Sequence, residues 1–156
     1  MSSTERTRVT LRPARSADAV AVAACVQEAY RHYVTRIGTR PGPMLEDYAD
    51  VIAREHVTVA ERDGSIAGLV VLAEGDEGFL VANVAVAPAF QGQGIGRALL
   101  EFAEHEARRR GHPEIYLYTH EKMVENRALY AKLGYSDYDL RRENGFTRVY
   151  MRKSLK

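Results

Sequence analysis

The sequence predicts an alternating α/β fold, in which strands and helices follow one another along a single domain. Stretches where apolar residues recur at every second position alternate with stretches where they follow the 3.6-residue period of a helix. The chain of 156 residues is long enough to bury a sizeable core, and it contains no internal repeat, low-complexity tract or linker. Its hydrophobic share of 46% and charged share of 28% are ordinary for a globular protein. We therefore expect residues 1–156 to form one domain.

The first strand and the first helix are predicted near the start of the chain. Val9 and Leu11 alternate with polar neighbours, which indicates a strand over residues 7–12. Ser16 is a typical N-cap residue, and Asp18 would place a favourable negative charge in the first turn of a helix. The apolar residues that then repeat with a helical period are Ala19, Val22, Ala23, Val26, Ala29, Tyr30 and Tyr33.

A loop, a short helix and a hairpin are predicted next. Glycine and proline are frequent in residues 36–43, which indicates a loop, and a short helix is expected over residues 44–54. Strands are expected over residues 56–61 and 65–73. Asp63-Gly64 lies between them and is typical of a tight hairpin turn, because such a turn needs positive φ angles.

The middle of the chain predicts a third central strand followed by a long helix. The strand covers residues 79–86 and ends before Pro88. The helix covers residues 94–110, with its apolar residues on one face. Gly111 is a typical residue to end a helix, and Pro113 prevents its continuation.

The last third of the chain predicts a strand, a helix and a closing pair of strands. The strand covers residues 115–119. The helix covers residues 124–133 and ends at Gly134. Residues 135–141 and 146–152 have the pattern of an antiparallel pair.

The segment between the third central strand and the long helix has the features of an anion site. Gly92, Gly94 and Gly96 allow the backbone to approach a ligand closely. No Ser, Thr, Asp or Asn caps the helix, so its first N–H groups stay free to bind phosphate. Arg97 lies in the first turn, where the helix dipole disfavours a cation by a few tenths to about 1 kcal/mol unless an anion is bound. The alternative is a glycine-rich turn that only connects the two elements.

Two other phosphate-binding motifs fit this segment less well. The dinucleotide-binding fingerprint G-x-G-x-x-G fails, because Gly94 and Gly96 are followed by Leu99 where the third glycine should stand. The P-loop motif requires a Gly-Lys pair, which the chain lacks.

A second candidate for function lies on the late helix. Asn126 and Tyr130 are four residues apart and therefore share one helix face. Leu129 and Leu133 form the neighbouring apolar stripe. Tyr130 could thus present its hydroxyl to a cleft while its ring packs; the alternative is a core tyrosine whose hydroxyl has a partner.

The order of these segments resembles the GCN5-related N-acetyltransferase (GNAT) family. The run Gln91-Gly92-Gln93-Gly94-Ile95-Gly96 matches the (Q/R)-x-x-G-x-(G/A) motif of that family. Residues 126–135 resemble its late N-x-x-x-Y helix and the turn that follows. The resemblance covers the whole chain. It implies the GNAT fold, with a mostly antiparallel mixed sheet of about seven strands flanked by about four helices.

The resemblance also implies which residues would hold acetyl-CoA as the acyl donor. In the family, two neighbouring strands splay apart and the pantetheine arm lies against the first of them; Val84, Ala85 and Val86 hold the matching positions. A backbone N–H of this stretch would polarise the thioester carbonyl. Asn126 would hydrogen-bond the donor, and Tyr130 would face its sulfur. The residues that would hold the pyrophosphate are Gln91, Gly92, Gln93, Gly94, Ile95, Gly96 and Arg97.

The implied reaction is direct transfer of the acetyl group to a primary amine within a ternary complex. An amine with a pKa near that of lysine, about 10.4, must first lose a proton. The departing thiolate must gain one, and Tyr130 is the candidate general acid. The base is not evident: several family members use a glutamate on the central strands, where Asn83 stands here, and an amide cannot serve. Tyr118, His120, Glu121 and a water chain remain alternatives, and none is assigned.

The acceptor itself is not identified. In the family the first two helices and a late loop wall its pocket, which corresponds here to residues 30–48 and 141–144. Arg36 or Arg40 could meet an acidic group of the substrate, and Glu46-Asp47 could meet an amine. An ordinary charged loop is the alternative. A small molecule, a peptide N-terminus and a lysine side chain all stay open, as does association into a homodimer.

Composition argues against several other classes of protein. The net charge of +1 gives no general attraction to nucleic acid or to an anionic membrane, and no apolar run approaches the roughly 20 residues of a membrane span. Residues 1–8 have no signal-peptide core, and the lone Cys25 excludes an internal disulfide, so we expect a cytoplasmic protein. The five histidines show no zinc spacing, and we predict no metal site.

Two other functions are alternatives to that of an N-acetyltransferase. A non-catalytic acyl-CoA-binding sensor would keep the same cleft, and the lack of an evident base agrees with it. An unrelated nucleotide-binding module is disfavoured by the two failed phosphate motifs. Release of free thiol from acetyl-CoA would distinguish the enzyme from the sensor.

Overall fold

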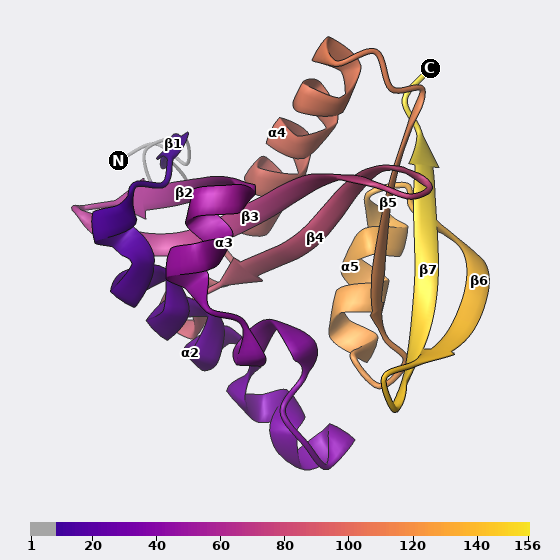
Figure 1. Ribbon diagram of the computed structural model, residues 1–156, viewed down its shortest axis with the longest axis horizontal. Helices are drawn as coiled ribbons and strands as arrows, with labels where there is room; N and C mark the ends of the chain where they lie inside the picture. The colour runs from indigo at the N-terminus through magenta and orange to yellow at the C-terminus, as the bar shows by residue number, and fades with distance from the viewer. Residues whose placement is uncertain (1–8) are drawn as a thin grey trace.

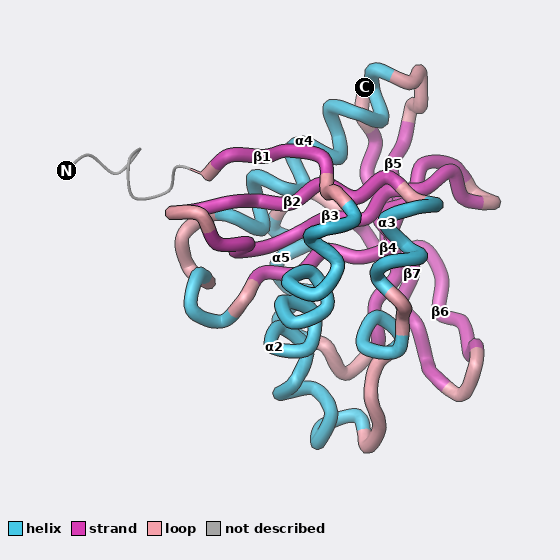
Figure 2. The backbone as a smooth tube through the Cα atoms, turned by 60° about the vertical axis from the view of Figure 1, so that its left-hand side comes forward, coloured by secondary structure: helices cyan, strands magenta, loops and turns pink. Residues whose placement is uncertain are grey.

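A computed structural model of the protein describes residues 9–156, which form a seven-stranded sheet with helices on both faces (Figures 1 and 2). The predicted α/β fold with seven strands and four α-helices is confirmed within these residues. The strands are β1 (Thr10–Pro13), β2 (His56–Arg62), β3 (Ser65–Gly75), β4 (Gly78–Val86), β5 (Glu114–His120), β6 (Ser136–Glu143) and β7 (Phe146–Ser154). The α-helices are α2 (Ala19–Ile37), α3 (Tyr48–Arg54), α4 (Ile95–Arg109) and α5 (Val124–Lys132). The predicted first strand began at residue 7, and its first two residues lie outside the described range.

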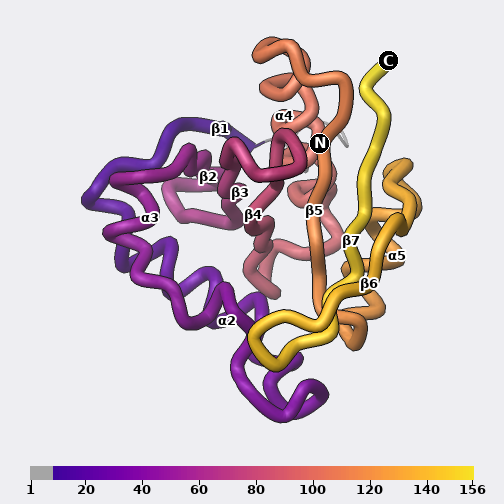
Figure 3. Tube along the Cα trace, turned by 45° about the vertical axis from the view of Figure 1, so that its right-hand side comes forward, coloured from indigo at the N-terminus to yellow at the C-terminus, as the bar shows by residue number. Residues whose placement is uncertain are grey.

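The strands follow the order β1-β2-β3-β4-β5-β7-β6, so that β1 and β6 lie at opposite edges of the sheet (Figure 3). Every neighbouring pair is antiparallel except β4 and β5, which are parallel. This agrees with the predicted mixed and mostly antiparallel sheet. The helix α4 makes the crossover that a parallel pair requires.

The parallel pair is short, and the two strands separate beyond it (Figure 1). Their pairing covers only Phe79–Val81 of β4 and Ile115–Leu117 of β5. At the same level the register between β3 and β4 shifts, because Val71 faces Asn83 while Leu72 faces Val81. One residue of β4, Ala82, is therefore an extra residue, and such a bulge bends and twists its strand. The bulge accompanies the divergence of β4 from β5.

Alternation along the strands divides the core between the two faces of the sheet. On β3, Val70 and Leu72 belong to the core that contains α4, whereas Leu69 and Val71 belong to the core that contains α2 and α3. Figure 2 shows α2 and α3 on one side of the sheet and α4 on the other. The sheet is thus covered on both faces around β3 and β4.

The turns and the ends of the helices agree with the glycine signals in the sequence. Asp63 and Gly64 have φ angles of 53° and 80°, as the turn between β2 and β3 requires. Gly111 follows α4 with φ of 83°, and Gly134 follows α5 with φ of 102°. Both are in the left-handed region, in which glycine is favoured after a helix.

The short helix α3 starts later than predicted. It begins at Tyr48 and not at residue 44, because Gly42–Leu45 form a 3-10 helix, η2, before it. The start of α3 is set by Asp47, whose carboxylate accepts the N–H of Ala49 at 3.1 Å. An aspartate in this role satisfies an otherwise unpaired amide of the first turn.

The first helix also starts differently from the prediction. Ser16 was expected as its N-cap, but Ser16–Asp18 form a 3-10 turn, η1, and Asp18 precedes α2. The carboxylate of Asp18 accepts two hydrogen bonds from Arg12, at 2.8 and 3.0 Å, and the N–H of Arg15 at 2.7 Å. These bonds lower the pKa of Asp18 to about 2 and join β1 to the start of α2.

This ion pair predicts a defined loss of stability in acid. In the unfolded chain an aspartate titrates near 3.9, so the lowered pKa contributes stability that is complete above about pH 4 and is lost as the pH falls to about 2. We expect Asp18→Asn to lower the free energy of unfolding by about 1–2 kcal/mol at pH 7. Urea unfolding of both proteins should show this difference shrinking between pH 4 and pH 2. The control is Asp76→Asn, in the exposed turn between β3 and β4, and a difference that stays constant with pH would contradict the assignment.

No α-helix within residues 9–156 combines the length and the apolar character that crossing a lipid bilayer requires.

Candidate active site

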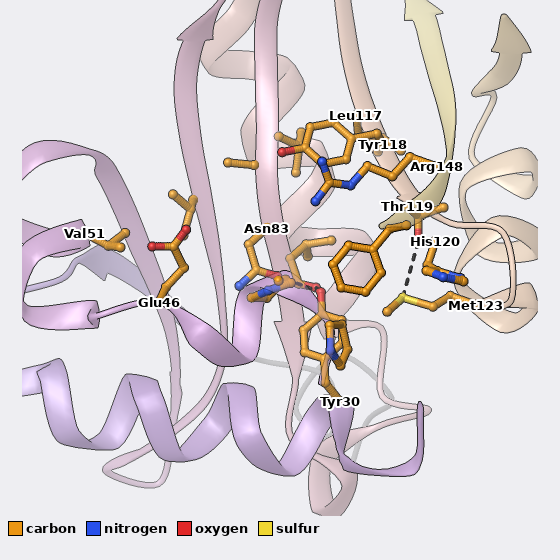
Figure 4. A pocket seen from close by; sticks show the side chains of 18 of the residues that line it. Tyr30, Glu46, Val51, Asn83, Leu117, Tyr118, Thr119, His120, Met123 and Arg148 are labelled. Carbon is orange, nitrogen blue, oxygen red and sulfur yellow. Dashed lines mark hydrogen bonds between the residues drawn. The ribbon is translucent and has the colours of Figure 1, made fainter. Parts of the chain in front are cut away.

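Two cavities meet where β4 and β5 separate. The larger one, here called the α4 cavity, has a volume of about 550 Å³ and lies between β4, α5 and the start of α4. The smaller one, here called the β5 cavity, has a volume of about 190 Å³ and lies between β4, β5 and the segment around η2 and α3 (Figure 4). Tyr30, Val84 and Tyr130 line both. Groups bound in the two cavities would therefore face each other at these three residues.

The start of α4 has the open amides that the sequence predicted. Gly92 and Gly94 have φ angles of 79° and 81°, which place both in the left-handed region. Gly94 is the N-cap residue and no side chain caps the helix. Within residues 9–156, the amides of Ile95, Gly96 and Arg97 have no hydrogen-bond partner. Free amides and the helix dipole together favour a bound anion here.

Arg97 is available to the same anion. Its side chain is 63% exposed, and its nearest carboxylate, that of Glu101, lies 4.0 Å away. An exposed pair at this distance contributes little to stability. The guanidinium can therefore turn toward a ligand at the helix start at little cost.

Most of the residues predicted to hold the donor line the α4 cavity. Gln93 is the exception: it does not line this cavity, and its buried Oε1 has no hydrogen-bond partner within the described residues. The lining residues that were not predicted to hold the donor are Ala29, Tyr30, His32, Tyr33, Phe90, Glu125, Leu129, Lys132 and Leu133. The predicted residues that do line it are Val84, Ala85, Val86, Gln91, Gly92, Gly94, Ile95, Gly96, Arg97, Asn126 and Tyr130.

The free edge of β4 presents backbone groups to the space between the strands. The N–H of Ala87 donates to the carbonyl of Ala67, which precedes the first residue of β3 that pairs with β4, Gly68. In an antiparallel pair the backbone N–H and C=O groups of alternate residues point toward the partner strand. Those of Ala87 point toward β3, so those of Val84 and Val86 follow the opposite direction and point away from β3. The carbonyl of Val86 accordingly accepts a bond from Gln91 Nε2 at 3.1 Å, and that of Val84 lies 3.3 Å from the hydroxyl of Tyr30, whose shorter bond goes to Asn83. The amides of Val84 and Val86 therefore point into the gap.

The late helix brings Asn126 and Tyr130 to the α4 cavity together, as their spacing predicted. Tyr130 is 5% exposed, and its ring packs edge-on against Tyr135 with 6.1 Å between the centroids. Its hydroxyl has no hydrogen-bond partner within residues 9–156. Burial raises the pKa of Tyr130 well above its ordinary value, so the phenol keeps its proton at neutral pH.

Asn83 occupies the position on β4 where a base was considered, and its amide is held on both sides. Its Oδ1 accepts the hydroxyl of Tyr30 at 2.7 Å, and its Nδ2 donates to the hydroxyl of Tyr48 at 3.1 Å. Tyr48 in turn donates to the carbonyl of Pro43 at 2.6 Å. This buried chain fixes one wall of the β5 cavity and contains no carboxylate or imidazole that could act as a base. The helical period placed Tyr30 on the core face, but it could not reveal this partner 53 residues away.

The other candidates for a base differ in their position. Tyr118 and His120 line the β5 cavity, whereas Glu121 lines neither cavity. The Nδ1 of His120 accepts the N–H of Lys122 at 3.0 Å, so that neutral His120 carries its hydrogen on Nε2. Burial lowers the pKa of His120 and favours this neutral form.

The predicted acceptor segment lines the β5 cavity only in part. Arg36 is not among the lining residues, because its guanidinium forms an ion pair with Glu125 at 2.5 Å, and Arg40 does not line the cavity either. Glu46 does line it, whereas Asp47 caps α3. The expected residues 141–144 do not line it; Phe146 and Arg148 do, two and four positions beyond the end of that range. Neither Arg36 nor Arg40 therefore reaches the β5 cavity in this structure, and their contact with the substrate stays a prediction.

Histidine, cysteine, aspartate and glutamate side chains form no group that could hold a metal ion in the part of the chain that the structure describes.

The fold and the joined cavities define the chain as a protein of the acetyltransferase fold class. A family model of the acetyltransferase (GNAT) domain matches residues 53–137, which is more than half of the chain. The chain therefore belongs to the GNAT family, as the resemblance in its sequence implied.

Comparison with individual proteins agrees with this assignment. The chain is 40% identical over 60 residues to the ribosomal protein bS18-alanine N-acetyltransferase of Escherichia coli K12, an alignment that covers 38% of this chain and 40% of that enzyme. Among solved structures, the PaiA N-acetyltransferase of Thermoplasma acidophilum in complex with coenzyme A has a TM-score of 0.78 at 18% identity, covering 94% of this chain and 99% of that one. A GNAT family acetyltransferase of Elizabethkingia anophelis with acetyl-CoA bound has a TM-score of 0.73 at 21% identity, covering 94% and 97%. At these identities the likeness is one of fold.

Proposed function

We propose that the protein is an acetyl-CoA-dependent N-acetyltransferase that transfers the acetyl group directly to a primary amine. The observation that carries the proposal is the meeting of the two cavities at Tyr30, Val84 and Tyr130. A thioester is already activated, so the main task of an enzyme is to align it with a neutral amine. A donor in one cavity and an acceptor in the other would be aligned in this way, with no covalent intermediate on the protein.

The α4 cavity suits acetyl-CoA in size and in charge. Its volume of about 550 Å³ lies within the range of about 300–1,000 Å³ that is typical of small-molecule sites. The amides of Ile95, Gly96 and Arg97 and the guanidinium of Arg97 would hold the pyrophosphate. Asn126 would hydrogen-bond the donor, and β4 would accept the pantetheine arm along its free edge. Two structural neighbours have coenzyme A or acetyl-CoA bound, which agrees with this donor.

The amides of Val84 and Val86 would stabilise the charge that develops during the reaction. Attack by the amine places negative charge on the carbonyl oxygen of the thioester. Amides fixed in a strand are already oriented toward this oxygen, and removing one such donor from an enzyme costs about 10²–10³ in rate. We propose that one of these two amides forms the oxyanion site.

Tyr130 would supply a proton or a hydrogen bond to the departing thiolate. It lines both cavities, and its hydroxyl keeps its proton at neutral pH. Its ring packs edge-on against that of Tyr135. A phenol that is held at the junction in its neutral form can act as a general acid.

The amine would lose its proton without a carboxylate on β4. The carboxylates that line the β5 cavity are Glu46 and Glu55, and Glu55 lies 3.7 Å from Arg54. Glu46 would attract the protonated amine and could receive its proton through water. His120 is the weaker candidate, because its Nε2 carries the hydrogen in the neutral ring.

The acceptor is proposed only as a primary amine. The curated relative is named for the N-acetylation of an alanine of a ribosomal protein, but the alignment with it covers only 60 residues and does not extend this acceptor to the present chain.

We also propose that the protein acts in the cytoplasm, with which the single, free and buried Cys25 agrees.

A sensor that binds acyl-CoA without turnover is the second candidate. The observation that favours it is that Asn83, at the position on β4 where a base was considered, is an amide that is hydrogen-bonded to Tyr30 and Tyr48. This position therefore supplies no base. Such a protein would bind acetyl-CoA normally and release no thiol.

Release of free thiol from acetyl-CoA, measured against a broad panel of amines, tests the proposal. We expect release that depends on both the protein and the amine. Varying both substrates should give intersecting reciprocal plots, as a ternary complex requires, and not the parallel plots of a covalent mechanism. Tight binding of acetyl-CoA with no amine-dependent release would instead support the sensor.

A further inference from the structure

We propose that the β5 cavity selects acceptors that carry a carboxylate in addition to the amine, as a free amino acid does, and that Arg148 binds this carboxylate. The inference rests on the proposed acetyl transfer and specifies the acceptor.

Arg148 reaches from β7 across the mouth of the β5 cavity. It pairs with His120 in the register between β5 and β7, so both side chains lie on the face that lines the cavity. Its Nη2 lies 3.8 Å from the position that a Cβ atom on Gly42 would occupy, which places the guanidinium near the opposite wall. Figure 4 shows the guanidinium pointing into the cavity beside Tyr118. The side chain is only 17% exposed.

The hydrogen-bonding capacity of Arg148 is largely unused. Its single hydrogen bond within residues 9–156 runs from Nη1 to Glu143 at 3.4 Å, which is long for a charged pair. Glu143 accepts a much shorter bond, of 2.6 Å, from Tyr150. By contrast, Arg12 and Arg141 each bind two carboxylates at 3.0 Å or less. The Nε and Nη2 groups of Arg148 are therefore open to a ligand.

The rings around Arg148 orient it for a planar anion. The guanidinium carbon lies 4.8 Å from the centre of the Tyr118 ring and 5.7 Å from that of Phe146. Tyr118 is itself stacked on Tyr150 at 5.1 Å. A guanidinium held in this way presents its N–H groups as a fixed fork, which matches the two oxygens of a carboxylate.

The remaining charges of the cavity favour an acceptor with one amine and one carboxylate. Arg54 also lines the cavity, but it is paired with Asp50 at 2.8 Å and with Glu55 at 3.7 Å. Glu46 lies on the side opposite Arg148 (Figure 4), where it would attract a protonated amine and oppose a second anion. The volume of about 190 Å³ is below the range of drug-sized sites, which favours a small molecule. Tyr118, Phe146 and Met123 supply walls for an apolar side chain.

Matched pairs of ligands test this proposal. Each pair consists of free L-leucine, L-methionine or L-phenylalanine and its carboxamide, which keeps the amine and the side chain but removes the negative charge. Binding to the protein saturated with coenzyme A is measured by calorimetry, and kcat/KM by thiol release. We expect the wild type to prefer the acid in at least one pair, and Arg148→Gln to lower the affinity and kcat/KM for that acid by about 10- to 100-fold. The carboxamide should change less than 3-fold. Arg148→Lys should restore part of the preference, because it keeps the charge without the fork.

Controls separate this proposal from a structural role and from the proposed function. Arg54→Gln removes an equal charge from the same cavity and should leave the preference unchanged. The KM for acetyl-CoA and the melting temperature of Arg148→Gln should stay near the wild-type values. Equal binding of acid and carboxamide by the wild type, binding of neither, or equal losses for both in Arg148→Gln would overturn the proposal. Selective binding of the acid without any thiol release would uphold it and count against catalysis.

Discussion

Replacing Tyr130 with Phe should lower kcat by about 10²–10⁴ and leave the affinity for acetyl-CoA nearly unchanged. The substitution removes one hydroxyl and keeps the ring that packs against Tyr135. A hydrogen bond to the departing sulfur strengthens as negative charge builds on it, so its loss should affect the transition state more than the bound donor. Asn126→Ala should behave in the opposite way, with a weaker affinity for acetyl-CoA and a smaller change in kcat. The measurements are kcat and donor affinity, with an amine that the wild type accepts.

Tyr135→Phe is the matched control for this experiment. Tyr135 is also buried, and its hydroxyl has no hydrogen-bond partner within residues 9–156, but it lines neither cavity. Removing that hydroxyl should leave kcat unchanged. Wild-type turnover by Tyr130→Phe, under conditions where the chemical step limits the rate, would show that Tyr130 only packs.

Gly94→Val should abolish the rise in melting temperature that acetyl-CoA produces. A ligand at about 100 times its dissociation constant stabilises the native state by about 2.7 kcal/mol, which in a chain of this length corresponds to about 5–11 °C. Gly94 has φ of 81°, a conformation that a β-branched residue adopts only with strain, so the turn before α4 must rearrange. The amides of the first turn would then no longer point together at the pyrophosphate.

Gly111→Val controls for the strain itself. Gly111 lies at the other end of α4 with φ of 83° and, like Gly94, has open space where a side chain would begin. Both variants should have lower melting temperatures without ligand, but only Gly94→Val should lose the response to acetyl-CoA. Gly96→Val provides a second test: its Cβ would lie 3.6 Å from Val86 and 3.8 Å from Leu129, so its methyl groups would enter the α4 cavity. An unchanged response in both Gly94→Val and Gly96→Val would remove the glycine segment from the proposed site.

The features that could be predicted from the sequence are those that depend on neighbours along the chain. Asp63-Gly64, Gly111 and Gly134 all have the positive φ angles that their positions predicted. The uncapped start of α4 was predicted in the same way, because it depends only on which residue types are absent there. Asn126 and Tyr130 lie on one helix face since the helical period requires it.

The features that could not be predicted depend on contacts between distant segments. The bulge at Ala82 carries no sequence signal, because bulges are formed by a pairing and not by a residue type. The bonds of Asn83 to Tyr30 and Tyr48 span 53 and 35 residues. Arg148 was missed because the loop before its strand was expected to wall the cavity, whereas the alternation of β7 turns Arg148 itself inward. The predicted starts of α2 and α3 were each a few residues early, because short 3-10 turns, Ser16–Asp18 and Gly42–Leu45, precede these helices.

The short parallel pairing between β4 and β5 is the narrowest backbone connection within the sheet. Three residues of each strand pair a part that contains β1, β2, β3 and β4 with a part that contains β5, β6 and β7. The other contacts between the two parts are made by side chains, as between Lys153 of β7 and Glu104 of α4. The α4 cavity crosses the boundary between the two parts, since its walls include the start of α4 on one side and Asn126 and Tyr130 of α5 on the other. A molecule bound there would touch both parts of the sheet and add contacts between them. The ion pair between Arg36 of α2 and Glu125 of α5 already connects the same two parts, so the donor would connect them at a second place.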